Sequence, residues 1–183
     1  MTHQLDSTHH RIYARPAQLA DAADLKQMCW PERALDSLQD LLKRAQLLSI
    51  RRQGLAVVGI YNGRICGFGL LTLWIDSAEI SDLIVHPDYR SQGIGSHMIT
   101  VLTQAAVDLR VRVLEIGVLP SNVRALALYR RMGFIDDHTV DVDLGRGPET
   151  VLYLVKKFEA SPAHQLPDSP WNNVRTAGSS GSG

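Results

Sequence analysis

The chain has 183 residues, a formal net charge of zero and 45% hydrophobic residues. A chain of this length and apolar content can bury one hydrophobic core, so one domain is expected. Balanced charge argues against a nucleic-acid binder that relies on a basic face. No apolar run approaches the length that crosses a bilayer, and the polar first residues do not resemble a secretory signal, so no membrane partner is expected.

Periodic patterns in the N-terminal part of the chain predict two helices followed by a hairpin. Residues 1–10 are mostly polar and are expected to form a flexible leader. Asn62-Gly63, between two runs of β-forming residues, is a strong signal for a tight hairpin turn. The expected elements are a strand over 12–15, helices over 17–30 and 33–51, and strands over 55–61 and 64–74.

The C-terminal part alternates strand and helix patterns and then ends in a polar segment. The expected elements are strands over 78–85, 112–118, 135–144 and 150–156, and helices over 96–109 and 123–132. Helices inserted between strands, with hairpins at both ends, predict a mixed α/β sheet covered by helices. Residues 159–183, rich in Pro, Ser, Asn and Gly, are expected to form a disordered tail.

The two cysteines, Cys29 in a helix pattern and Cys66 in a strand pattern, are expected to be reduced thiols in the core. Reduced thiols fit a cytoplasmic protein. Histidines and cysteines nowhere show the spacing of metal ligands, so no metal is expected.

The segment Arg90-Ser91-Gln92-Gly93-Ile94-Gly95 lies between a predicted strand and a predicted helix. A strand, a glycine-bearing turn and a helix start bring free backbone N–H groups and the positive end of the helix dipole around one point, which suits a phosphate. A P-loop would need Gly-Lys-Ser/Thr at the helix start, and a dinucleotide fingerprint would need a third glycine where Met98 stands. The alternative to an anion site is an ordinary strand-to-helix turn with glycines for geometry.

A second motif follows, with a buried strand over 113–118, then Asn122, a helix, and Gly133-Phe134. Together with the stretch from Val85 to Gly95, this order and the spacing from Asn122 to Tyr129 resemble the GNAT superfamily of N-acetyltransferases. The resemblance covers residues 11–158. It implies a mostly antiparallel sheet of six to seven strands, a V-shaped splay between strands four and five, and about four flanking helices.

The resemblance also implies acetyl-CoA as co-substrate and a set of residues that bind it. Strand backbone at the end of the 78–85 strand would hold the acyl-pantetheine arm, and the amides of the glycine turn would wrap the diphosphate. Arg90 would contact phosphate or brace the turn, and Asn122 would contact the arm or act as a helix N-cap. The cofactor-binding residues so implied are Leu83, Ile84, Val85, Arg90, Ser91, Gln92, Gly93, Ile94, Gly95, Ser96, Asn122 and Tyr129.

Tyr129 matches the position from which many members of the superfamily protonate the CoA thiolate, and a phenol suits that chemistry. The alternative is that Tyr129 only packs at the edge of the cleft.

Glu79 resembles the glutamate that the histone-acetyltransferase branch uses as general base; the alternative is an exposed acid at a strand start. Even spacing puts Glu79, Ser81, Leu83 and Val85 on one face of a regular strand and Asp82 on the other. Other members carry a carboxylate where this chain has Gly117; Glu115 is a poorer candidate, and Asp82 could attract a cationic amine.

These observations predict an N-acetyltransferase that transfers an acetyl group from acetyl-CoA to a primary amine, on a small molecule or a protein. Neither motif contains a cysteine, so transfer is expected to be direct, within a ternary complex. The alternative is a CoA-binding or sensing module of the same fold without efficient catalysis. The sequence shows no motif that identifies the acceptor amine, and the chain could be a monomer or a homodimer paired through edge strands.

Overall fold

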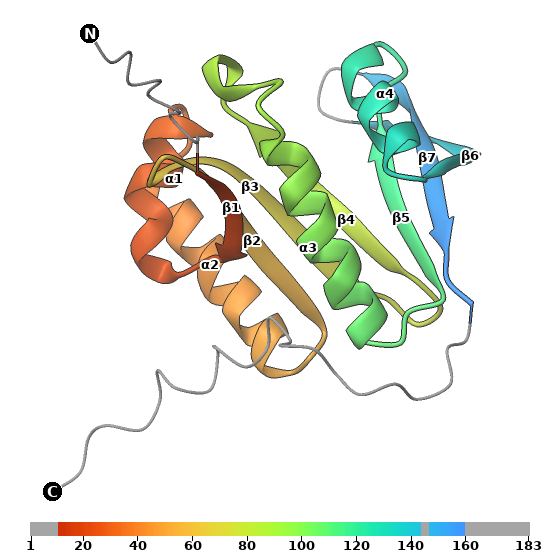
Figure 1. Ribbon diagram of the computed structural model, residues 1–183, viewed down its shortest axis with the longest axis horizontal. Coiled ribbons are helices and arrows are strands. Elements are labelled where there is room, and N and C mark those ends of the chain that lie inside the picture. The colour runs from red at the N-terminus through yellow and green to blue at the C-terminus, as the bar shows by residue number, and fades with distance from the viewer. Residues whose placement is uncertain (1–10, 144–146, 160–183) are drawn as a thin grey trace, which may run out of the picture.

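Figure 1 shows a computed structural model of the chain, which describes residues 11–143 and 147–159. Within these residues the chain forms one seven-stranded sheet in the order β1-β2-β3-β4-β5-β7-β6. The strands are β1 (Ile12–Pro16), β2 (Gly54–Tyr61), β3 (Arg64–Leu73), β4 (Ala78–Val85), β5 (Val113–Val118), β6 (Ile135–Asp143) and β7 (Pro148–Lys157). The helices are α1 (Ala22–Met28), α2 (Leu35–Ile50), α3 (Ile94–Asp108) and α4 (Val123–Arg131), with short 3-10 turns η1 (Leu19–Asp21) and η2 (Pro87–Tyr89).

The sheet is antiparallel except between β4 and β5, which pair in parallel. Helix α3 is the crossover between these two strands, as a parallel pair requires. The predicted mixed α/β sheet with about four helices is therefore confirmed.

Two hydrophobic clusters cover opposite faces of the sheet. One cluster joins the buried side of α3, including Met98 and Leu102, to Leu126 and Tyr129 of α4. The other joins α1 and α2 to side chains of β2 and β3 such as Val58 and Phe68. The cysteines divide between these clusters: Cys29 and Cys66 are buried, and neither forms a disulfide, as expected.

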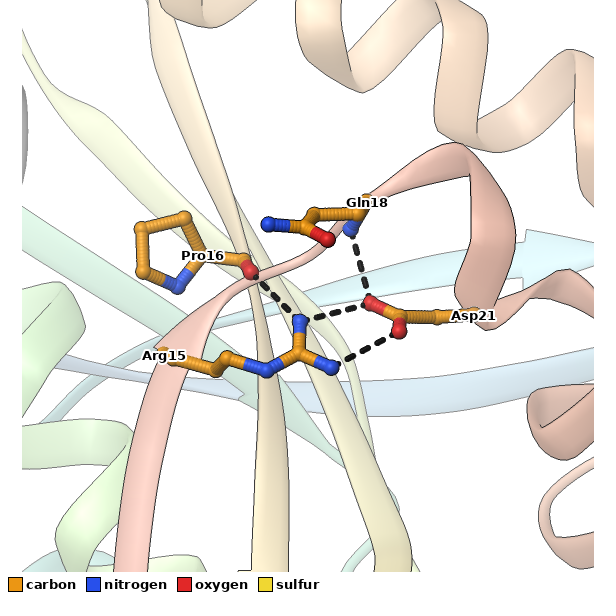
Figure 2. A network of polar contacts seen from close by, with 4 residues as sticks. All are labelled: Arg15, Pro16, Gln18 and Asp21. Carbon is orange, nitrogen blue, oxygen red and sulfur yellow. Dashed lines mark hydrogen bonds and ion pairs between the residues drawn. The ribbon is translucent and has the colours of Figure 1, made fainter. Parts of the chain in front are cut away.

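The connection from β1 into η1 and α1 is fixed by a buried carboxylate (Figure 2). Asp21, only 5% exposed, accepts two 2.8 Å hydrogen bonds from the guanidinium of Arg15 and a 2.7 Å bond from the backbone N–H of Gln18. Arg15 also donates to the carbonyl of Pro16 at 3.0 Å. A bidentate arginine pair with a further backbone donor satisfies a carboxylate that would otherwise be costly to bury.

Strands β4 and β5 part after three residue pairs. They pair only where Ala78, Glu79 and Ile80 face Leu114, Glu115 and Ile116, although both strands continue beyond these residues. The predicted splay between the fourth and fifth strands is therefore confirmed (Figure 1).

Just beyond this point β4 contains a bulge, which makes one sequence expectation wrong. Ser81 pairs with Leu70 but Ile84 pairs with Phe68, so Asp82 and Leu83 together face one residue of β3, and Asp82 has a φ of +51°. The extra residue reverses the alternation of side chains. Ile80, Leu83 and Val85 therefore lie on the α3 face, whereas Glu79, Ser81 and Ile84 lie on the opposite face.

The observed helices and strands match the predicted ones within a few residues, with two informative differences. The predicted first helix, 17–30, divides into η1 and the shorter α1. Helix α3 begins at Ile94 rather than residue 96, because Gly93 has a φ of +87° and turns the chain directly into the helix.

The expected leader 1–10, the tail from residue 160 and part of the last turn, 144–146, lie outside the described residues. None of the helices described is long and apolar enough to cross a bilayer.

Gly59 of β2 allows α3 to lie close against the sheet. A Cβ at this position would come within 2.5 Å of Cγ2 of Ile94 and 2.9 Å of Sδ of Met98. Ile94 is the first residue of α3, so the space left by Gly59 also determines where the glycine turn meets the sheet.

We expect Gly59→Ala to lower the free energy of unfolding by about 1–3 kcal/mol, because the added methyl group must displace the start of α3. Chemical denaturation of wild type and variant measures the difference. Gly117→Ala, whose Cβ would come no closer than 3.1 Å to Val151, is the milder comparison and should cost less. Equal stability of Gly59→Ala and wild type would contradict the close approach.

Candidate functional site

A cleft of about 220 Å³ opens where β4 and β5 diverge. Its walls come from β4, from the end of β5 and from α4. The residues that line it are Ile80, Ser81, Asp82, Leu83, Ile116, Gly117, Val118, Leu119, Asn122 and Tyr129. The separation of the strands leaves backbone groups of Asp82, Leu83 and Val118 without a partner strand across the cleft, which an extended ligand could use.

The glycine turn lies between the end of β4 and the start of α3. Ser91 and Gly93 both have positive φ angles, +62° and +87°, so the backbone coils tightly before the helix. Within the described chain no side chain caps the start of α3, and its first N–H groups therefore remain available for an anion. The exposed turn can accept a phosphate through backbone amides alone.

Arg90 has a defined structural contact in this turn. Its Nε donates a 3.1 Å hydrogen bond to the carbonyl of Val85, the last residue of β4. Of the two roles expected for Arg90, this contact supports bracing of the turn.

Helix α4 approaches the turn from the other side of the cleft. A Cβ on Gly95, in the first turn of α3, would lie 3.3 Å from Leu128 of α4 and 3.8 Å from Val85 of β4. Arg124, in the first turn of α4, donates a 2.8 Å hydrogen bond to the hydroxyl of Ser91. The two motifs found in the sequence are therefore in direct contact.

Asn122 and Tyr129 both face the cleft from α4. Asn122 is the N-cap of the helix, and its side-chain oxygen accepts a 3.1 Å hydrogen bond from the N–H of Ala125, which leaves its amide N–H₂ available to a ligand. Tyr129 is 5% exposed, and burial raises its pKa to about 12. The phenol therefore carries its proton throughout the neutral range.

Glu79 does not line the cleft. It lies on the sheet face opposite α3, one residue before the strands diverge, directly beside Glu115 of β5. The hydroxyl of Tyr153 on β7 donates to Oε1 of Glu79 at 3.4 Å, and the ring of His138 stacks on Tyr153 with centroids 5.1 Å apart. Burial and the Glu79 carboxylate raise the pKa of Tyr153.

The structure thus brings together most of the residues singled out in the sequence, from the end of β4, the glycine turn and the start of α4. It leaves Glu79 beside the cleft rather than in it. Sequence reasoning missed Arg124 and Tyr153. Arg124 could have been noticed as a cation at a helix N-terminus, whereas Tyr153 meets Glu79 only through the pairing of β7 with β5.

Among the described residues, no group of three or more histidine, cysteine, aspartate or glutamate side chains could hold a metal ion.

Comparison with known proteins gives a family match across both motifs. A family model described as the acetyltransferase (GNAT) family matches residues 19–134. The ribosomal protein bS18-alanine N-acetyltransferase of Escherichia coli (strain K12) is 33% identical over 73 residues, which is 40% of this chain and 49% of that protein. The chain thus spans about half the length of this curated relative.

Solved structures extend the likeness to the whole fold. The yncA protein of Salmonella typhimurium, solved with its cofactor acetyl-CoA, has a TM-score of 0.66 at 21% identity, and the match covers 86% of this chain and 98% of that one. A ribosomal-protein-alanine N-acetyltransferase from Brucella melitensis has a TM-score of 0.66 at 23% identity and covers 79% and 99% of the two chains. At these identities the likeness establishes the shared fold.

The raised pKa of Tyr129 predicts a loss of stability at high pH. The unfolded phenol ionises near pH 10, whereas the buried one keeps its proton to about pH 12, so the unfolded state binds fewer protons between these values. This residue should therefore lower the free energy of unfolding by about 1.4 kcal/mol per pH unit at most over that interval.

Urea denaturation at pH 8 and pH 11 measures this loss. Tyr129→Phe should lose less stability than wild type between the two values, and Tyr13→Phe, at an exposed ring on β1, should lose as much as wild type. An equal loss in Tyr129→Phe and wild type would show that the phenol is not buried as described.

Proposed function

Because this chain belongs to the acetyltransferase (GNAT) family, we propose that it transfers an acetyl group from acetyl-CoA to a primary amine. The observation that carries the proposal is the continuity between the glycine turn and the cleft: Val85 ends the diverging strand, and Gly95, in the first turn of α3, lies close beside it. One elongated ligand, with a diphosphate at one end and a thioester at the other, can occupy both. The proposed acetyltransferase domain comprises residues 11–158.

We propose that the backbone of the glycine turn binds the diphosphate. Amides from Ser91 to Ser96 would donate to its oxygens, with the dipole of α3 behind them. Arg90 would act indirectly, by holding the turn to Val85.

The pantetheine arm would lie along β4 in the cleft. Free backbone groups from Leu83 to Val85 would bind it in the manner of an added strand, and the amide of Asn122 would contact it from the opposite wall. A backbone N–H near Val85 would stabilise the negative charge that develops on the acetyl oxygen.

The reaction forms a C–N bond to the acetyl carbon and breaks the C–S bond. The acceptor amine must first lose a proton, and the thiolate that leaves gains one. Tyr129 suits the second transfer, because its pKa of about 12 keeps it protonated at neutral pH and it faces the cleft. A thiolate in the same poorly hydrated cleft also has a raised proton affinity, which favours the transfer.

For the first transfer we propose Glu79 as the base, acting through water. Glu79 and Ser81 share the sheet face opposite α3, and Ser81 lines the cleft. Two residues of strand, about 7 Å, separate their positions, so a short chain of water molecules can connect Glu79 to the cleft. Asp82 and Glu115 are the alternatives, but Asp82 is exposed within the bulge and Glu115 lies on the neighbouring strand without a recorded hydrogen bond in the described chain.

The proposal is tested by calorimetry with CoA and acetyl-CoA and by turnover with a panel of primary amines. We expect both CoA and acetyl-CoA to bind, and we expect acetyl-CoA to release free CoA only when an amine is present. Failure of well-folded protein to bind CoA would refute the proposal. Tight CoA binding with no turnover on a broad panel would instead favour a CoA-sensing module.

The two acid–base residues should differ in their pH response. Tyr129→Phe should lower kcat by about 10²- to 10⁴-fold at all pH values, with acetyl-CoA affinity little changed. Glu79→Gln should show a comparable loss at neutral pH that diminishes above pH 10, where a growing share of a lysine-like amine is deprotonated without help from a base.

Steady-state kinetics from pH 6.5 to 10.5 test both expectations. Glu115→Gln, at the neighbouring position on β5, serves as the matched control and should retain wild-type kcat. If the pH profile of kcat for Glu79→Gln matched that of wild type, Glu79 would not be the general base. The proposed reaction itself would be unaffected.

A further inference from the structure

Arg124 is a charged residue that forms no ion pair within the described part of the chain. It lies exposed in the first turn of α4, where the positive end of the helix dipole disfavours a cation and where no acidic residue offsets it. Its recorded partner is the neutral hydroxyl of Ser91, at 2.8 Å. The positive charge of Arg124 therefore remains uncompensated.

The surroundings of Arg124 concentrate positive potential at one point. The first turn of α3 packs against α4, since a Cβ on Gly95 would lie 3.3 Å from Leu128. The first turn of α4 reaches the glycine turn through the hydrogen bond from Arg124 to Ser91. Both helices begin at the end of the sheet where β4 and β5 diverge (Figure 1). An anion at the glycine turn would meet two helix N-termini and the guanidinium together.

Arg90 and Arg124 both contact the region of the glycine turn, but they differ in their hydrogen-bond partners. Arg90 donates from Nε to the carbonyl of Val85 within its own strand-turn segment. Arg124 instead reaches the turn from another element, 33 residues away in the chain, and contacts it through one Nη2 atom. A guanidinium has five N–H donors, so this single hydrogen bond leaves donors of Arg124 for a second ligand.

We infer that Arg124 is a cofactor-binding residue that donates to a phosphate of CoA and, through Ser91, holds α4 against the diphosphate turn. This inference rests on the proposed function. The hydrogen bond to Ser91 fixes the side chain at the turn before the cofactor arrives, so less rotamer freedom is lost on binding. Because Asn122 and Tyr129 lie on the same helix, the contact also fixes the cleft wall that they form.

Calorimetry and turnover with full and truncated cofactors test the inference. Arg124→Gln should weaken CoA binding about ten- to a hundredfold, the loss expected for a charge-assisted hydrogen bond. It should leave KM for acetyl-pantetheine, which carries no phosphate, within about twofold of wild type. An unchanged CoA affinity would overturn the inference, and so would an equal loss on acetyl-pantetheine, which would indicate a merely structural residue.

Two control variants distinguish a direct contact of the Arg124 guanidinium with phosphate from a purely structural role in holding the turn. Arg131→Gln removes an exposed arginine from the far end of the same helix and should bind CoA as wild type does. Ser91→Ala removes the recorded hydrogen bond but keeps the guanidinium, and should lose less affinity than Arg124→Gln. A loss in Ser91→Ala equal to that in Arg124→Gln would mean that Arg124 only braces the turn, against the inference.

Dephospho-CoA distinguishes the possible phosphates. A loss in Arg124→Gln that persists with dephospho-CoA assigns the contact to the diphosphate, whereas a loss that disappears assigns it to the 3′-phosphate; either result supports a phosphate contact. If wild type itself binds neither compound, the proposed function fails, and that result is distinct from failure of the Arg124 contact.

Discussion

The separation of β4 from β5 creates the cleft on which the candidate site of this molecule depends. Two parallel neighbours in a sheet normally continue to pair, but here pairing ends after Ile80 and Ile116. A bulge at Asp82 and Leu83 bends β4 at that point, and the φ of +51° at Asp82 marks the local distortion. Unpaired backbone at the middle of a sheet must find another partner, so the gap suits a ligand that can hydrogen-bond like a strand.

The bulge also divides the site between two faces of the sheet. After it, Leu83 and Val85 point to the side of α3 and α4, where Tyr129 and the glycine turn lie. Before it, Glu79 and Ser81 point to the other side, where Tyr153 and His138 lie. In the proposed reaction, the residues that would bind the cofactor and the carboxylate that would accept the amine proton approach the cleft from opposite sides, so two substrates could meet across one gap.

Close packing of α3 connects the fold to the proposed phosphate site. The helix can approach β2 because Gly59 has no Cβ, and its first residue, Ile94, is buried in the contact. The turn that precedes α3 is held to β4 by the hydrogen bond from its own Arg90 to Val85, and to α4 by the hydrogen bond from Arg124 to Ser91. Three separate elements therefore position a short loop that has little apolar surface of its own.

The order of helices and strands, the glycine turn and the spacing from Asn122 to Tyr129 could all be predicted from the chain, because they follow from local periodicity and from residues close in sequence. The placement of Glu79 on the face opposite Leu83 and Val85 could not be predicted, because one extra residue in β4 reverses every later side chain and is recognisable only from the pairing with β3. The contacts of Arg124 with Ser91 and of Tyr153 with Glu79 could not be predicted either, because each joins residues far apart in the chain. Sheet order and helix packing bring these residues together. Short-range sequence fixes which elements form; the register and packing between distant elements fix which side chains meet.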